Sequence, residues 1–456
     1  MLFKFKIKNN VVEMIVDGNA SGKTLIEGLV DTDRVHKSCY TSEEIFQQEI
    51  DNIFYKSWIY AGHESQIKNK GDFTTFQIGR QPMILVRGDD GAFHVLFNRC
   101  PHRGAMLTNW HMGNAGHHFI CSYHAWHFNF DGSIHAIPSP KGYDETRFEK
   151  SDPESCMKAA PRVASYRGFV FASLAEDGPD LETWLSGAKA AFDDMCDRSP
   201  EGEVEVVRTC FRVVQKSNWK IFLENQLDAL HPSITHGAAG KAAADVEEEI
   251  KAETGKDAPL HYHYLSAFTT PIYKWDGLET AGHPFGHCML QGYMGLRPTD
   301  PDTLEYEALM EKAYGKERTE DILTTNIHHV LVYPCLSVQS PLQQLRAVRP
   351  LGPDKTLTEI WHFRLKGAPD AIYDRSLQYY NLVNSPSTMI NADDLYNFWR
   401  CQQGLEREGG DWVSFHRNEG QDHHNDGVTT SVTGLSELPM RHMFTAWVDY
   451  MKGDRQ

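Results

Sequence analysis

The sequence has no long apolar run. Nothing in its 456 residues approaches the roughly 18 consecutive apolar residues that a transmembrane helix requires. Residues 1–18, MLFKFKIKNNVVEMIVDG, alternate in the manner of a β-strand and carry charges throughout, so they lack the apolar core and cleavage site of a signal peptide. We therefore expect a cytoplasmic protein that makes no use of a membrane.

Positive charge is also in short supply. Lysine and arginine together number 45 against 62 aspartates and glutamates, which leaves a net charge of −17 at pH 7. Nucleic acids and anionic lipids are bound through basic patches, and this balance does not favour one. We expect no nucleic-acid partner.

Cysteine is sparse and odd in number. The nine cysteines are scattered along the chain, which is not the pattern of a disulfide framework. Histidine, in contrast, is plentiful at 23 residues, and histidine is the commonest metal ligand in proteins. A chain of this length with 41% hydrophobic residues is long enough for two or three domains.

Local patterns divide the chain into three parts. Residues 1–55 form an N-terminal segment that ends in a predicted helix over 41–58, with Thr41 as cap and Glu44 completing a capping box; we expect this helix to pack on the last domain. Residues 56–175 contain short segments such as FTTFQIG, PMILVRG and RGFVFASL, which predict a small all-β domain. Residues 176–456 mix long strands with helices, including a predicted connecting helix over 180–198.

Four further stretches carry little functional signal. Residues 235–260 are small and charged, which predicts either a mobile surface loop or an exposed helix. GNASGKT at 18–24 is no phosphate-binding loop, because Gly18 precedes Gly22 by four positions rather than five, so we expect a flexible turn. The histidine pairs at 328–329 and 423–424 are interpreted as strand or surface residues.

Two mixed cysteine–histidine pairs lie inside the small β domain. Cys100-x-His102 is followed, after 18 residues, by Cys121-x-x-His124. Chance burial of cysteines and histidines is one explanation and a zinc site is another, but a zinc finger pairs cysteine with cysteine and places its histidines on a helix. A Rieske [2Fe–2S] centre replaces two cysteines by histidines on one iron, which fits one cysteine and one histidine from each of two loops.

A second group of metal-ligand residues follows in the last domain. NWKIFLENQLDALHPSITH, residues 218–236, predicts a helix capped by Ser217, with Glu224, Asp228 and His231 at i, i+4 and i+7 on one polar stripe. Such a stripe is also what a plain solvent face looks like. His236 would lie about 140° from His231 on a continuous helix, but Pro232 should end the helix and let the two imidazoles approach. They would then supply two ligands of a 2-His-1-carboxylate iron site.

Taken together, these stretches resemble a known family. CPHRGA and CSYHAWHFNFDG are similar to the Rieske motif of the ring-hydroxylating oxygenases, large (alpha) subunit, and E-N-x-x-D-x-x-H-P-x-x-x-H is similar to the catalytic signature of that family. The resemblance implies that Cys100, His102, Cys121 and His124 hold the [2Fe–2S] cluster. It further implies that His231, His236 and Asp394 hold a mononuclear Fe(II), with Asp393 as the alternative to Asp394.

The resemblance also implies a role for Asp228 and an architecture. Asp228 would bridge His231 to a Rieske histidine, expected to be His124, across a subunit boundary. The implied fold class is α+β: an all-β Rieske domain and a helix-grip catalytic domain, an antiparallel sheet covered by helices. The implied assembly is a homotrimer or an α3β3 complex with a small beta subunit.

The function implied by the resemblance is that of a terminal oxygenase in aromatic hydrocarbon catabolism. Electrons from NAD(P)H would arrive through a ferredoxin, a reductase or both, and O2 would cis-dihydroxylate or hydroxylate an aromatic substrate. A Rieske monooxygenase or demethylase is the alternative within the family, and an electron-transfer protein without oxygenase chemistry is the alternative outside it. Phe222, Leu227 and Leu230 are candidates either for the substrate pocket or for the core, and His261, His263 and Arg346 either for contacts to an aromatic carboxylate or for structural roles.

Overall fold

The computed structural model describes residues 4–8, 11–15, 26–295 and 297–453. The GNASGKT stretch lies outside these residues. Strands β1 (Lys4–Lys8) and β2 (Val11–Ile15) pair as an antiparallel hairpin, where the alternating sequence predicted a strand. No helix in the described part of the chain is both long enough and apolar enough to cross a membrane.

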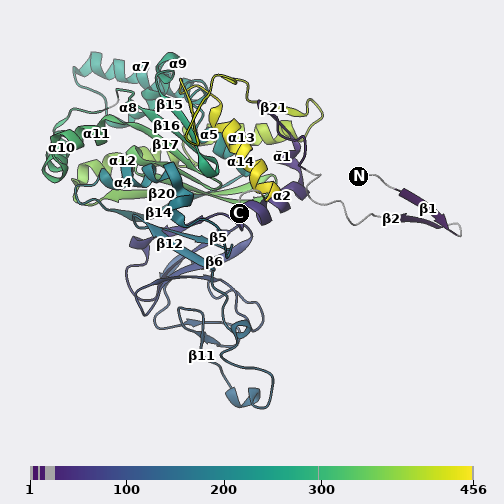
Figure 1. Ribbon diagram of the computed structural model, residues 1–456. Helices are drawn as coiled ribbons and strands as arrows, with labels where there is room; N and C mark the ends of the chain where they lie inside the picture. The colour runs from purple at the N-terminus through teal and green to yellow at the C-terminus, as the bar shows by residue number, and fades with distance from the viewer. Residues whose placement is uncertain (1–3, 9–10, 16–25, 296, 454–456) are drawn as a thin grey trace.

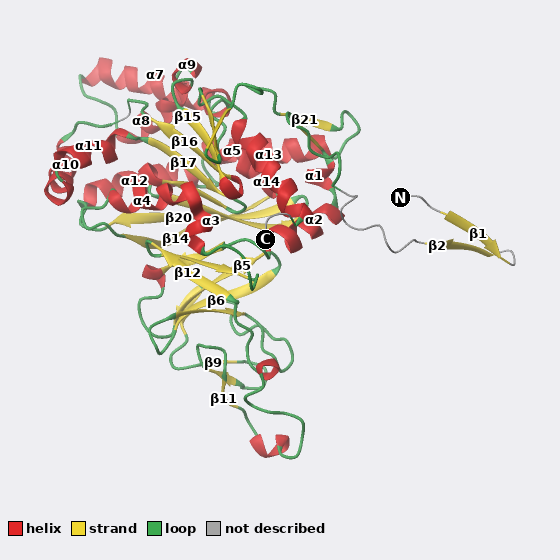
Figure 2. Cartoon of the chain, in the orientation of Figure 1, coloured by secondary structure: helices red, strands yellow, loops and turns green. Residues whose placement is uncertain are grey.

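The small domain consists of three antiparallel sheets (Figure 2). The expected strands FTTFQIG, PMILVRG and RGFVFASL correspond to β5, β6 and β13. The first sheet contains β7 (Phe93–Phe97), β6 (Gln81–Arg87), β5 (Asp72–Ile78) and β8 (Met112–Asn114); the second β12 (Arg162–Tyr166), β13 (Phe169–Ser173) and β4 (Ile59–His63); the third β11 (Ile134–Ala136), β10 (His127–Phe128) and β9 (Phe119–Ile120). Figure 2 shows β9 and β11 towards the end of this domain that lies farthest from the large sheet.

The large domain is built on one nine-stranded antiparallel sheet. Its strands run in the spatial order β14 (Val204–Gln215), β20 (Lys355–Leu365), β19 (Gln344–Gly352), β18 (Leu336–Gln339), β17 (Ile327–Val332), β16 (His287–Gly292), β15 (Glu279–His283), β23 (Val428–Ser431) and β22 (His423–Asn425). A separate pair joins β3 (Arg34–His36) to β21 (Trp412–Ser414). The expected α+β class, with an antiparallel sheet covered by helices, is confirmed.

Helices pack around this sheet (Figure 2). They are α1 (Ser38–Thr41), α2 (Glu43–Glu49), α3 (Leu181–Leu185), α4 (Lys189–Asp197), α5 (Trp219–Gln226), α6 (His231–Thr235), α7 (Gly237–Thr254), α8 (Leu260–Ser266), α9 (Ile272–Trp275), α10 (Pro301–Tyr314), α11 (Lys316–Thr324), α12 (Asp370–Asn384), α13 (Met389–Leu405) and α14 (Leu438–Lys452). Of the two expectations for residues 235–260, the helix is the one observed, as α7.

The N-terminal helix differs from its prediction at its cap. Ser42, not Thr41, accepts the hydrogen bond from the Ile45 amide, and the helix continues past α2 as a π-helical turn over Ile50–Phe54. Glu49 at its centre is fully buried and accepts hydrogen bonds from the indoles of Trp219 (2.8 Å) and Trp447 (2.7 Å). This carboxylate therefore ties the N-terminal helix to α5 and α14.

The connecting segment 180–198 is two helices rather than one. Asp180 caps α3 through the Thr183 amide, and a short 3-10 turn over Ser186–Ala188 separates α3 from α4. The chain passes so close to β15 at this turn that a Cβ added to Gly187 would collide with the ring of His283. Close packing against the sheet, which periodicity does not report, interrupts the helix here.

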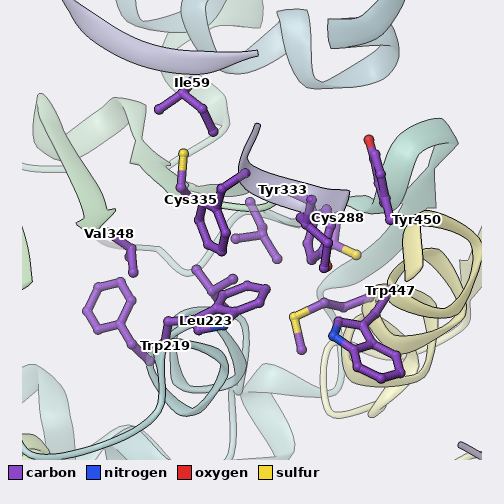
Figure 3. Packing of buried hydrophobic residues seen from close by; sticks show 14 of the residues in the cluster. Ile59, Trp219, Leu223, Cys288, Tyr333, Cys335, Val348, Trp447 and Tyr450 are labelled. Carbon is purple, nitrogen blue, oxygen red and sulfur yellow. The ribbon is translucent and has the colours of Figure 1, made fainter. Parts of the chain in front are cut away.

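A shared hydrophobic core joins the two domains. Figure 3 shows Trp219 of α5 and Trp447 of α14 in one cluster with Val348 of β19 and Ile59 of the small domain. The four side chains are at most 1% exposed. Burial of this continuous apolar surface, at about 25 cal/mol per Å2, holds the small domain against the large sheet.

Candidate metal centres

The first cysteine–histidine loop is a tight turn that follows β7. The Cys100 amide donates to the Ala105 carbonyl (2.8 Å), and the Gly104 amide donates back to the Cys100 carbonyl (2.9 Å). Gly104 has φ +77°, a conformation that glycine adopts without the strain of a Cβ. The turn buries the Cys100 thiol, which is 1% exposed, and leaves His102 part-exposed at its tip.

The second loop repeats this hydrogen-bond pattern. The Cys121 amide donates to the Trp126 carbonyl and the Ala125 amide to the Cys121 carbonyl, both at 2.9 Å. Ala125 takes the left-handed conformation (φ +51°) that Gly104 takes in the first loop. Two matching turns therefore present one buried thiol and one part-exposed imidazole each.

The four side chains meet at one place. The rings of His102 and His124 lie 4.7 Å apart, and the indole of Trp126 stacks on His102 at 4.8 Å. Nδ1 of His124 is buried and has no hydrogen-bond partner in the described part of the chain. Burial, and then the neighbouring Cys121 thiol, raises the pKa of Cys100. Two buried thiols beside an unpartnered imidazole nitrogen fit a [2Fe–2S] cluster, whose positive charge would favour the thiolates.

The second predicted site does not lie on one continuous helix. Helix α5 is capped by Asn218, whose Oδ1 accepts from the Lys220 amide, and not by Ser217. It ends at Gln226, so Glu224 is helical while Asp228 lies beyond the last turn. Pro232 occupies the first turn of a new helix, α6, which begins at His231. The helix break predicted from Pro232 therefore occurs, but the first helix ends at Gln226, several residues before the proline.

This break brings His231 and His236 together with a distant carboxylate. The two imidazole rings lie 5.8 Å apart, and Oδ1 of Asp394 lies 3.2 Å from Nε2 of His236 and 3.8 Å from Nε2 of His231. One ligand atom from each residue lies within 4.8 Å of the others. Asp394 is in the second turn of α13, which begins at Met389. Two imidazoles and one carboxylate at this spacing fit a divalent iron.

The orientation of the His231 ring is set by Asp228. Nδ1 of His231 lies 2.8 Å from the Asp228 carbonyl and donates its proton there, which leaves the Nε2 lone pair facing Asp394. The Asp228 carboxylate accepts from the Leu230 amide (2.9 Å) and lies 3.4 Å from the guanidinium of Arg417. Burial disfavours its charged form, but His231, the Leu230 amide and Arg417 together hold the pKa of Asp228 below its usual value.

A cavity of about 390 Å3 opens beside this cluster, and His231, His236 and Asp394 form part of its wall. Phe222 and Leu227 belong to the core instead. Of the residues considered for contacts to an aromatic carboxylate, His263 and Arg346 line the cavity, whereas His261 is not among the lining residues. His329 of β17 also lines the cavity, although the sequence suggested only a strand or surface histidine. Its position on the strand could be recognised only once the cavity-facing side of the sheet was known.

Comparison with known families assigns both parts of the chain. The Rieske [2Fe-2S] domain family matches residues 57–165, and the family described as ring hydroxylating alpha subunit (catalytic domain) matches residues 181–453. The chain is 33% identical over 395 residues to the toluate 1,2-dioxygenase subunit alpha of Pseudomonas putida, covering 85% of this chain and 84% of that protein. It is 29% identical over 446 residues to the biphenyl 2,3-dioxygenase subunit alpha of Rhodococcus jostii, covering 93% and 91%.

A solved structure has the same fold. Naphthalene 1,2-dioxygenase with indole bound in the active site superimposes with a TM-score of 0.78, at 22% identity, over 93% of each chain. The agreement extends over both domains and the helices around the large sheet.

Proposed function

Because the chain belongs to the ring-hydroxylating oxygenase alpha subunits, we propose that it adds both atoms of O2 to an aromatic ring held in the cavity beside His231, His236 and Asp394. The chain is the terminal oxygenase component, an oxidoreductase with a Rieske [2Fe–2S] cluster and a mononuclear iron. The observation that carries the proposal is the pairing, in one chain, of the two-cysteine, two-histidine loops with a 2-His-1-carboxylate cluster that opens onto a cavity.

The assignment of residues to the two metals is part of the proposal. Cys100, His102, Cys121 and His124 would hold the cluster, and His231, His236 and Asp394 would hold the iron. When bound, these metals supply electron storage and the activation of O2. We likewise keep the division into residues 1–55, 56–175 and 176–456 as a proposal.

The remaining chemistry belongs to side chains of this chain. Asp228 fixes the His231 ring by accepting the Nδ1 proton at its carbonyl, so that Nε2 carries a lone pair, which would bind the metal in place of its present contact with Nδ2 of Asn225 (3.0 Å). Apolar cavity residues such as Phe268 and Leu290 hold the ring and exclude water. Formation of a cis-diol consumes two electrons and two protons along with O2, and NAD(P)H is the source of the electrons.

Electron delivery requires partners. The second cysteine–histidine loop connects β9 to β10, and Figure 1 shows β11, the partner strand of β10, far from α5 and α13. The aromatic side chain of Tyr123 (61% exposed) lies in the second loop with its ring 3.9 Å from that of His124, and Trp110 (76% exposed) follows the first loop along the chain. These features support docking of the loops onto another protein: a ferredoxin or reductase, and the Asp228 region of a second subunit in a homotrimer or α3β3 complex with a small beta subunit. A cytoplasmic location, where NAD(P)H is available and cysteines stay reduced, completes the proposal.

A single-turnover experiment tests the reaction without knowledge of the natural donor. The holoenzyme is reduced chemically under argon, mixed with benzoate or biphenyl, and exposed to 18O2. The expected product carries two labelled oxygen atoms as a cis-diol. A product with only one labelled oxygen atom would show that the reaction is a monooxygenation. Oxidation of the cluster without any oxygenated product would reject oxygenase chemistry in favour of electron transfer.

A further inference from the structure

The cavity wall contains an arginine that lacks a carboxylate partner. Among the described residues, four arginines line the cavity, and three of them form ion pairs. These pairs are Arg198 with Asp194 (3.0 Å), Arg297 with Glu307 (2.8 Å) and Arg375 with Asp300 (2.9 Å). Arg346 of β19 forms no ion pair with a carboxylate of the described chain, and it is therefore the cavity's uncompensated cation.

Arg346 is nevertheless held firmly. Its guanidinium donates to three neutral amide oxygens, those of Asn384 (2.6 Å), Gln226 (2.8 Å) and Gln339 (3.3 Å), which belong to α12, α5 and β18. Its Nε is buried without a hydrogen-bond partner in the described part of the chain. The amides fix the orientation of the side chain but do not neutralise its charge.

The surroundings make this unbalanced charge costly. Burial holds the pKa of Arg346 below its usual value, and Asp394 acts on it only from beyond ion-pair distance. Asp394 is in addition a proposed iron ligand, so its charge would be shared with the metal. A buried charge without a counter-ion is unfavourable, and guanidinium groups form their strongest contacts with planar carboxylates.

We propose that Arg346 binds the carboxylate of the substrate, so that the ring oxidised in this cavity belongs to an aromatic carboxylic acid rather than to a hydrocarbon. The inference rests on the proposed function for the cavity and the metals beside it. The names of the relatives do not decide the matter, since one acts on toluate and the other on biphenyl. Arg346 is thus assigned as a specificity-determining residue.

A chain of amide contacts relates Arg346 to the proposed iron ligands. Gln226 accepts from Arg346 (2.8 Å) and donates to Oδ1 of Asn225 (3.0 Å), and Nδ2 of Asn225 donates to Oδ1 of Asp394 (3.4 Å). The position of the guanidinium is therefore coupled to that of the ligand cluster. A bound carboxylate at Arg346 would be placed at a fixed offset from the metal, which is what regioselective attack on one ring requires.

Benzoate and nitrobenzene form a matched pair of probes, because the nitro group has the shape of a carboxylate without its net charge. Dissociation constants are measured by equilibrium dialysis of the anaerobic holoenzyme. We expect the wild type to bind benzoate at least about tenfold more tightly than nitrobenzene, and Arg346→Gln to lose at least about tenfold in benzoate affinity with little change for nitrobenzene. Arg346→Lys, which keeps the charge, should retain part of the preference.

The control variant is Arg375→Gln. Arg375 also lines the cavity, but its charge is matched by Asp300, so the ratio of the two dissociation constants should remain that of the wild type. If Arg346 had only a structural role, its substitution would weaken both probes alike. That result would overturn the proposal. A wild type that binds nitrobenzene as tightly as benzoate would also overturn it, and this second outcome does not depend on the stability of any variant.

The two proposals fail in different ways. Conversion of biphenyl to a labelled diol by a wild type with no preference for benzoate would leave the oxygenase function intact and overturn the role of Arg346. Tight, Arg346-dependent binding of benzoate without any oxygenated product would support the role of Arg346 and reject the oxygenase function.

Discussion

Asp394 places a carboxylate oxygen 3.2 Å from Nε2 of His236, whereas the adjacent Asp393 lies 3.5 Å from Nδ1, on the other edge of the same ring. Only the Nε2 edge also faces His231, so the two neighbouring aspartates cannot play the same part. Asp394 has the geometry of a ligand, whereas Asp393 lies near the opposite ring nitrogen, which has no hydrogen-bond partner in the described part of the chain.

The first prediction compares these two aspartates. Asp394→Asn should lose the mononuclear iron because the neutral amide oxygen of asparagine is a weaker ligand than a carboxylate. The iron content should therefore fall from about three to about two per chain while the cluster remains. Asp393→Asn should keep about three. Iron analysis combined with the visible absorbance of the cluster measures both, and the opposite pattern would make Asp393 the ligand.

The second prediction concerns electron transfer through Asp228. Asp228→Asn preserves the backbone carbonyl that orients His231, so both metals should stay bound, but turnover should fall by roughly 100-fold because the proposed carboxylate bridge to a Rieske histidine would lose its charge. Rapid mixing with substrate and O2 should show slow oxidation of the reduced cluster. Asp245→Asn, an exposed change on α7, serves as the control and should match the wild type. Loss of cluster absorbance in Asp228→Asn would contradict the bridging role.

The third prediction separates the cluster cysteines from other thiols. Cys121→Ser should abolish the cluster absorbance because a buried hydroxyl does not replace a thiolate on iron. Cys156→Ser, in the same domain but with a part-exposed thiol, should leave the spectrum unchanged. A wild-type spectrum in both variants would exclude Cys121 as a ligand.

The fourth prediction is a pH dependence at the boundary between the domains. His63 is 4% exposed and packs against Phe169 of the small domain and Phe363 of β20, with ring centroids at 4.8 and 5.5 Å. Burial, and then the charge of Lys366, lowers the pKa of His63 from 6.5 to about 3. Because the folded-state pKa lies below the unfolded one, the stabilisation is complete above pH 6.5 and is lost as the pH falls towards 3.

Thermal unfolding of the wild type and of His63→Phe measures this effect. Phenylalanine keeps a ring at the boundary but cannot be protonated, so the decline in Tm between pH 7 and 4 should be shallower in the variant. The variant also loses the hydrogen bond between His63 and Ser65, which shifts its Tm relative to the wild type. This shift does not depend on pH in this range, so the slopes of the two curves remain comparable. Parallel curves would show that His63 does not contribute to the acid sensitivity.

Local sequence signals were sufficient where a feature depends on neighbouring residues. The strands of the small domain follow from β-branched and aromatic segments between turn residues, and the approach of His231 to His236 follows from the helix break near Pro232. The helix caps at Ser42 and Asn218 were each misplaced by one residue. Adjacent polar residues offer equivalent caps, and only the packing of the helix decides between them.

The sequence by itself determined which ligand chemistry this protein carries: two cysteine–histidine loops and a histidine pair, each set by spacings of a few residues. Only the tertiary structure decided which aspartate meets that pair and left Arg346 without a carboxylate while its neighbours in the cavity found one. The reason is physical. Spacing along the chain fixes geometry only over a few bonds, whereas contacts between α13, β19 and α5 are set by how side chains fill a common core.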